Sequence, residues 1–144
     1  MAHDARNPDW IRTTLDTFNA APFIRDLGCR LVDIEPGRIV TELELAERHL
    51  QQDGYVHAGV QATLADHTAG TAAATLMAPG QIVLTIEFKL SLLAPARGER
   101  LVCRADVLKP GRQVSFTEAR VFAVADGAER LVSHFTGSMA LVSR

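Results

Sequence analysis

The sequence is short of several residue types, and each shortage excludes a class of protein. Only two cysteines occur, Cys29 and Cys103, and their spacing fits neither a metal site nor a redox motif. There is one Trp and one Tyr, and no apolar run approaches the roughly 20 residues that a membrane-spanning helix needs. Neither sign of charge dominates, because 15 Lys and Arg face 17 Asp and Glu for a formal net charge of −2. This balance predicts neither a nucleic-acid-binding protein nor one attracted to an anionic membrane.

The composition that remains fits one globular domain. The 144 residues are 47% hydrophobic and 22% charged, which is typical of a chain that buries its own core. Residues 1–8 contain no apolar core, so we expect no signal peptide. We therefore expect a single domain over residues 1–144 with a helical extension over residues 1–20. The cysteine usage predicts a cytoplasmic protein with reduced thiols.

The first part of the chain predicts helical segments followed by a hairpin. Asn7-Pro8-Asp9 is typical of a helix start, and Glu35-Pro36-Gly37 is typical of a turn between two strands. The expected elements are an amphipathic helix over residues 8–20, one more turn over 23–27, strands over 29–34 and 38–45, and a polar loop over 46–54.

The last part of the chain predicts four long strands. After Ala78-Pro79-Gly80 the apolar period changes from the 3.6 residues of a helix to the 2 residues of a strand. Short turns, including Asp126-Gly127, separate the runs and predict an antiparallel meander. The expected strands cover residues 84–92, 100–108, 113–124 and 130–142.

Between these two parts lies an Ala- and Gly-rich helix that carries an acidic residue. Nine of the nineteen residues from Ala58 to Leu76 are Ala or Gly, so neighbouring strands can approach this helix closely. Asp66 stands about two turns inside the helix, where Asp has poor propensity and is too far from the end to cap it. We therefore expect that something other than helix stability keeps Asp66 there.

The order of elements predicts an α+β fold in which one curved antiparallel sheet wraps around the Ala-rich helix. Only this helix is apolar or small over most of its circumference, so it is the one that the sheet can enclose. A single sheet around a single helix makes a thin core. We therefore expect an oligomer, because a monomer would leave apolar strand positions in contact with water.

These features resemble the hotdog fold and, more narrowly, the PaaI-like (phenylacetic-acid-degradation type) acyl-CoA thioesterases. The resemblance covers roughly residues 20–142 and rests on Gln51, the turn His57-Ala58-Gly59, the helical Asp66, and Thr85 on the following strand. Two positions depart from the family pattern. Ala58 replaces the first Gly of the turn, and Gln51 stands where close relatives often carry Asn.

The resemblance implies that the protein hydrolyses acyl-CoA thioesters. Asp66 is then the nucleophile or the general base that activates water. The main-chain N–H groups of Ala58 and Gly59, at the start of the helix, hold the thioester oxygen as it gains charge. Gln51 orients the water or the carbonyl, and Thr85 donates a hydrogen bond to Asp66 or to the water.

The resemblance also suggests how the substrate and the subunits are arranged. His57 belongs to the motif with a role that is more positional than catalytic. Arg112 and Lys109, beside the Pro110-Gly111 turn, are candidates to hold the phosphates of coenzyme A. No metal or further cofactor is implied, since coenzyme A is part of the substrate. The family is expected to form a homodimer or a homotetramer whose sites combine residues of two subunits.

Two other functions remain open from the sequence. The substitutions at Ala58 and Gln51 leave room for a protein that binds acyl-CoA or an acyl carrier without hydrolysing it. Hydratase or dehydratase chemistry on the same fold is less well supported. The position of the proton-shuttling His of the fatty-acid dehydratases is Gln52 here.

Overall fold

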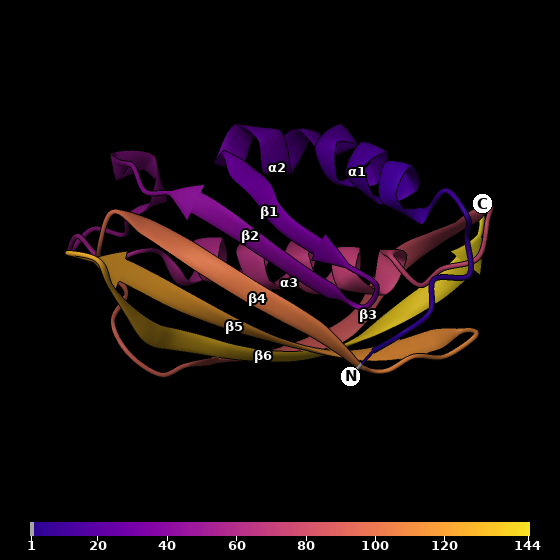
Figure 1. Cartoon of the computed structure of the whole chain (residues 1–144). Helices are drawn as coiled ribbons and strands as arrows, with labels where there is room; N and C mark the ends of the chain where they lie inside the picture. The colour runs from indigo at the N-terminus through magenta and orange to yellow at the C-terminus, as the bar shows by residue number, and fades with distance from the viewer. Residues whose placement is uncertain (1) are drawn as a thin grey trace.

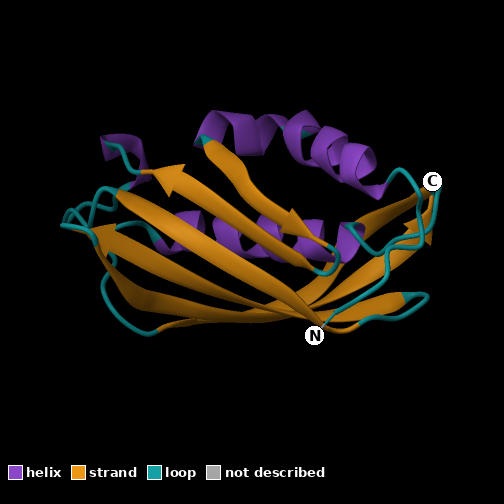
Figure 2. Ribbon diagram, viewed as in Figure 1, coloured by secondary structure: helices purple, strands orange, loops and turns teal. Residues whose placement is uncertain are grey.

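A long helix, α3 (Ala58–Ala74), lies in the hollow of a single curved sheet of six antiparallel strands (Figures 1 and 2). The structure is a computed structural model that describes residues 2–144. The strands follow the order β1-β2-β4-β5-β6-β3, so β1 and β3 form the two edges of the sheet. The other elements are α1 (Trp10–Ala20), α2 (Pro22–Leu27), β1 (Cys29–Glu35), β2 (Arg38–Glu44), a 3-10 turn (Glu47–His49), β3 (Gln81–Leu92), β4 (Arg100–Lys109), β5 (Val114–Ala125) and β6 (Ala128–Ser143).

Small side chains on α3 allow the sheet to close around it. Ala65, Ala69, Ala72 and Ala73 are all 0% exposed, and α3 contacts β2, β4, β5, β6 and β3. No large side chain on these positions holds the strands away, so the backbone of the helix and the sheet can pack at short range. This packing confirms the α+β architecture and the hotdog fold that the sequence predicts.

The helix α1 covers part of α3 that the sheet leaves open. Phe18 of α1 is 2% exposed, and its ring centroid lies 4.7 Å from that of His67 on α3. After α1, the chain continues through α2 to β1. The helix α2 ends at Gly28, which has the left-handed conformation (φ 92°). The N–H of Gly28 donates to the carbonyl of Ile24, which satisfies the end of the short helix.

The edge strand β3 exposes a row of large apolar side chains. Leu84, Ile86, Phe88 and Leu92 are between 43% and 55% exposed. An edge strand also leaves main-chain N–H and C=O groups unpaired, so such a strand is suited to pairing with a further strand. We expected a monomer to leave apolar strand positions in contact with water, and β3 carries such positions.

The structure confirms the predicted elements and differs at their ends. β3 begins at Gln81 rather than at residue 84, because its first residues pair with the end of β6, where Gln81 faces Ser143. The helix α3 ends at Ala74 rather than at residue 76. The predicted loop over 46–54 contains the short 3-10 turn. Within residues 2–144, none of the helices has the length and apolar character needed to cross a membrane.

The tight packing of α3 generates a stability prediction. Replacing Ala69 with Leu adds three carbons at a position that is 0% exposed, and overpacking of this kind destabilises a core by about 1–3 kcal/mol. The control is Ala20→Leu at the exposed end of α1, which adds the same carbons outside the core. Chemical denaturation followed by circular dichroism measures both variants. Equal stability of Ala69→Leu and the wild type would contradict close packing of α3 against the sheet.

Candidate functional site

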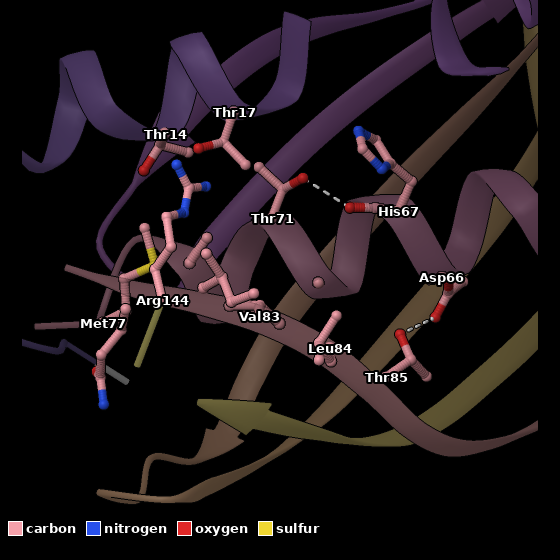
Figure 3. Close-up of a pocket in the computed structure, with 14 residues that line it drawn as sticks. Thr14, Thr17, Asp66, His67, Thr71, Met77, Val83, Leu84, Thr85 and Arg144 are labelled. Atoms are coloured by element: carbon pink, nitrogen blue, oxygen red, sulfur yellow. Dashed lines mark hydrogen bonds between the residues drawn. The ribbon is translucent and has the colours of Figure 1, made fainter. Parts of the chain in front are cut away.

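A cavity of about 430 Å³ lies between α1, α3 and β3 (Figure 3). Asp66 and Thr85 lie at one end of the view in Figure 3, and Met77 and Arg144 lie at the other. The lining is mixed, with apolar side chains from β3 and hydroxyl groups from both helices. Its size falls in the range of small-molecule binding sites.

Asp66 and Thr85 form a hydrogen-bonded pair at the wall of this cavity. The Thr85 hydroxyl donates to Oδ1 of Asp66 at 2.8 Å (Figure 3). It also lies 3.5 Å from the sulfur of Met139. The register of β3 against β6 shifts between Thr85 and Glu87, and such an irregularity turns a side chain relative to its neighbours. Of the two partners that the sequence left open for Thr85, Asp66 or a water molecule, the structure shows the hydrogen bond to Asp66.

The surroundings of Asp66 favour its protonated form more than water does. Burial raises the pKa of the Asp66 carboxyl above its ordinary value of 3.8, and the hydrogen bond from Thr85 opposes that rise. A carboxylate that is partly desolvated and still ionised is a stronger base than one in water. Perturbed carboxylates in cavities are common at catalytic sites.

His67 follows Asp66 in the sequence but faces a different neighbour. Its ring extends toward α1 and lies against Phe18, whereas Asp66 extends toward Thr85 on β3 (Figure 3). Burial lowers the pKa of His67 to about 4, so the imidazole is neutral at neutral pH. The imidazole of His67 and the carboxylate of Asp66 therefore face different elements.

The other predicted motif residues lie in a second hollow, at the N-terminal end of α3. This hollow has a volume of about 630 Å³, and its lining includes Gln51, His57 and Ala58 together with Leu92 and Leu93. None of these residues is shared with the cavity that contains Asp66. From Ala58 to Asp66 the helix rises by about 12 Å, at 1.5 Å per residue. One thioester carbonyl cannot contact both places in a single chain.

The start of α3 is capped by His57, and one main-chain donor is left available. Nδ1 of His57 accepts a hydrogen bond of 2.8 Å from the N–H of Gly59, and the carbonyl of His57 accepts from Val60. Within residues 2–144, the N–H of Ala58 has no hydrogen-bond partner. His57 is thus the N-cap of α3. Of the two main-chain N–H groups predicted as oxyanion donors, the N–H of Ala58 is free among the described residues, and the N–H of Gly59 donates to His57.

Gln51 holds the loop that leads to α3. Its main-chain N–H donates to the carbonyl of Tyr55 at 2.7 Å, and its side-chain oxygen accepts from the N–H groups of Asp53 and Tyr55. These contacts fix the amide group, and its –NH₂ end makes no hydrogen bond to another of the described residues. The amide therefore retains donors for a ligand in the second hollow.

The basic residues predicted to hold coenzyme A lie away from both hollows. Lys109 ends β4, and Arg112 lies in the following turn, where it lines a third hollow with His3 and Arg6 near the C-terminal end of α3. Arg97 lies nearer the second hollow, because its guanidinium stacks 4.2 Å from the ring centroid of Tyr55. Among residues 2–144, no three side chains of His, Cys, Asp or Glu cluster so that they could hold a metal ion.

Several residues that share the cavity with Asp66 are not among those predicted from the sequence. Gly70 and Ala74 follow Asp66 at intervals of four residues, so helical spacing alone could have placed them beside it. Thr14 and Arg144 reach the cavity from α1 and from the end of the chain (Figure 3). No local pattern marks these two, because tertiary packing brings them there.

Comparison with known proteins agrees with this architecture. A family model of the thioesterase superfamily matches residues 53–129, which is more than half of the chain. The 1,4-dihydroxy-2-naphthoyl-CoA hydrolase of Listeria monocytogenes is 30% identical over 106 residues, covering 74% of this chain and 84% of that protein. Human acyl-coenzyme A thioesterase 13 is 33% identical over 110 residues, covering 75% of this chain and 78% of that protein.

Solved structures show the same fold. The crystal structure of a thioesterase family protein from Silicibacter pomeroyi superposes with a TM-score of 0.92 at 36% identity, covering 94% of this chain and 99% of that one. The PaaI protein of the E. coli phenylacetic acid degradation operon superposes with a TM-score of 0.83 and 94% coverage of each chain. Its identity of 17% makes this a likeness of fold alone. The chain belongs to the thioesterase superfamily and is an enzyme of that family with the hotdog fold.

Proposed function

We propose that this enzyme hydrolyses acyl-CoA thioesters to the free acid and coenzyme A, with Asp66 as the general base or nucleophile. The observation that carries the proposal is the Asp66 carboxylate, which lies in a cavity, is hydrogen-bonded to Thr85 and has a raised pKa. The coenzyme A thioester is the substrate class named for the Listeria and human relatives.

The chemistry needs one basic oxygen and one electrophilic carbonyl. As a general base, Asp66 takes a proton from water while the water oxygen attacks the thioester carbon. The carbonyl oxygen becomes an oxyanion, the C–S bond then breaks, and the proton passes from Asp66 to the leaving thiolate. As a nucleophile, Asp66 would instead form an acyl anhydride that water hydrolyses in a second step. Thr85 orients the carboxylate in both routes.

We infer that a complete site requires a second copy of this chain. An oxyanion donor must lie within about 3 Å of the reacting oxygen. The free N–H of Ala58 is about 12 Å along the helix from Asp66, so the donor that faces Asp66 has to come from elsewhere. The N-terminal end of α3 in a partner subunit supplies such a donor, together with the partner subunit's Gln51.

The exposed edge strand β3 supports a two-fold dimer of this kind. If β3 pairs with the same strand of a second copy, the sheet continues and the exposed Ile86 and Phe88 become covered. A two-fold axis perpendicular to the sheet makes the two α3 helices antiparallel. The start of one helix then approaches the middle of the other. A homotetramer would be a pair of such dimers.

The position of coenzyme A follows from the same arrangement. Its pantetheine arm would leave the site along the second hollow, and its phosphates would meet a basic group at the surface. Arg112 and Lys109 remain the family-based candidates, and Arg97 is a third because it borders the Tyr55 loop.

Cys29 and Cys103 are free buried thiols, which supports a reducing, cytoplasmic compartment.

Replacing Asp66 with Asn tests the catalytic role. Asn keeps an oxygen that can accept from Thr85 but has no basic carboxylate, so kcat should fall by about 10²–10⁴-fold. The assay measures thiol release from a panel of benzoyl-, phenylacetyl-, naphthoyl- and straight-chain acyl-CoAs. The control is Asp16→Asn, an exposed Asp on α1 that should keep wild-type activity. Binding without turnover in the wild type would instead indicate an acyl-CoA-binding protein.

Replacing Ala58 with Pro tests the oxyanion donor. Pro lacks the N–H, is favoured at the first position of a helix, and suits the extended backbone of His57 before it (φ −60°, ψ 140°). The thermal midpoint should therefore stay near that of the wild type, while kcat falls by about 10²–10³-fold. Unchanged kcat in Ala58→Pro would contradict this donor.

Co-expression of Ala58→Pro with Asp66→Asn tests whether two subunits share each site. A mixed dimer places both lesions in one site and leaves the other intact, so equal mixing should restore about a quarter of wild-type activity. No recovery in purified mixed dimers would mean that each chain holds its own site.

A further inference from the structure

A buried histidine lies beside the loop that leads to α3 and lines neither of the two hollows. His49 ends the 3-10 turn and is 2% exposed. Its Nδ1 accepts a hydrogen bond of 3.0 Å from the N–H of Ala46, and its Nε2 lies 2.8 Å from the carbonyl oxygen of Leu27. Because a main-chain N–H only donates and a carbonyl only accepts, these two contacts require the neutral imidazole with its hydrogen on Nε2.

The imidazole of His49 connects the 3-10 turn to the helix that precedes β1. Leu27 is the last residue of α2, so the hydrogen bond from Nε2 ties the turn to the C-terminal end of that helix. The two residues are 22 positions apart, so local chain geometry does not bring them together. Arg48 donates to the same carbonyl at 3.0 Å, but its side chain is exposed, where water competes for the contact. The bond from the buried ring is therefore the more persistent link.

The main chain of the same residue holds the start of α3. The carbonyl of His49 accepts a hydrogen bond of 2.9 Å from the N–H of His57. One residue earlier, the N–H of Val56 donates to the carbonyl of Ala96 at 2.9 Å. The N–H of Ala58 comes next in the chain and has no partner among the described residues. Its direction is therefore set by the residues before it, and one of these is bound to His49.

We propose that His49 is a positioning residue for the oxyanion donor. Its imidazole fixes the turn against α2, and its carbonyl fixes His57 and thereby the direction of the Ala58 N–H. The inference rests on the proposed thioester hydrolysis and on Ala58 as the donor. Oxyanion donors act at about 2.7–3.1 Å, and a displacement of about 1 Å can lower a rate by about a hundredfold. A buried residue that does not line the second hollow can therefore control kcat.

A purely structural role of the imidazole makes a different prediction. If the imidazole only stabilised the fold, its loss would lower the thermal midpoint and leave the kcat of the folded enzyme unchanged. If it positions the donor, kcat falls and KM changes little, because the oxyanion forms only in the transition state. The effect on kcat also disappears when the N–H of Ala58 is already absent.

Replacing His49 with Leu tests the proposal, because Leu is apolar and makes neither side-chain hydrogen bond. For the acyl-CoA that the wild type hydrolyses fastest, kcat should fall by about tenfold to hundredfold, while KM should stay within about threefold. His49→Gln keeps a side-chain donor for the Leu27 carbonyl and should retain part of the lost kcat. The control is His134→Leu on β6, outside both hollows, which should keep the wild-type kcat.

The double variant of His49→Leu and Ala58→Pro shows whether the effect passes through the donor. Pro has already removed the N–H, so adding His49→Leu should lower kcat by less than about threefold. If His49→Leu does not fold, the same comparison is made with His49→Gln, whose smaller loss of kcat should likewise vanish beside Ala58→Pro.

Hydrogen exchange followed by NMR gives a readout that does not depend on turnover. In His49→Leu, or in His49→Gln if the Leu variant does not fold, the N–H of His57 should exchange at least about tenfold faster than in the wild type. The N–H of Ala69, in the middle of α3, should change less, because the variant loosens only the start of the helix.

The outcomes separate the positioning role from the proposed function. Wild-type hydrolysis with an unchanged kcat in folded His49→Leu would overturn the positioning role and leave thioester hydrolysis standing. An equal loss of kcat with and without Ala58→Pro would also overturn that role. Absence of hydrolysis for every thioester would overturn the proposed function. The exchange measurement would then decide, since an unchanged rate at His57 would show that the imidazole does not hold the start of α3.

Discussion

The helix α3 packs directly against the concave face of the sheet, which is possible only because its side chains there are small. The rest of the structure depends on this close packing. Alanines such as Ala65 and Ala69 are 0% exposed there, so the strands curve around the helix without large side chains between them. The helix is enclosed on one side and only partly covered by α1 on the other. The uncovered strip, between α1 and β3, becomes the cavity that contains Asp66.

Placing a carboxylate on that strip works against folding. A mid-helix Asp lowers helix propensity, and partial burial raises its pKa, so the ionised form is less favourable in the folded chain than in water. The hydrogen bond from Thr85 offsets part of this penalty and also fixes the orientation of the carboxylate. Locally unfavourable residues of this kind are common at functional sites. At the start of α3, His57 caps the N–H of Gly59, and the N–H of Ala58 stays without a partner among the described residues.

Local pattern predicted the elements well because apolar period and turn residues are local properties. The family motif named Thr85 as a partner for Asp66 or for water, and a short connection between the helix and the next strand brings Thr85 to Asp66. Thr14 and Arg144 escaped prediction because distant segments bring them to the cavity. Lys109 and Arg112 are candidates for a phosphate site from charge near a turn and from the family resemblance, and the topology places Arg112 at the far end of α3 from Ala58 of the same chain. Residue types near a turn do not reveal which end of the fold that turn occupies.

The most direct test of the account is the free energy of unfolding of the wild type and of Asp66→Asn across pH, at one fixed protein concentration. Both keep an acceptor for Thr85, so the difference between them reports the ionised carboxyl. Because folding raises the pKa of Asp66, the folded state holds its proton to higher pH than the unfolded state. The free energy of unfolding of the wild type should therefore fall relative to that of Asp66→Asn as pH rises from 3.8 through the raised pKa of Asp66. Above that pKa, the difference between the two free energies should stay constant to neutral pH. A difference in the free energy of unfolding that does not change across this pH range, or that changes in favour of the wild type as pH rises, would contradict a carboxylate kept for chemistry at the expense of stability.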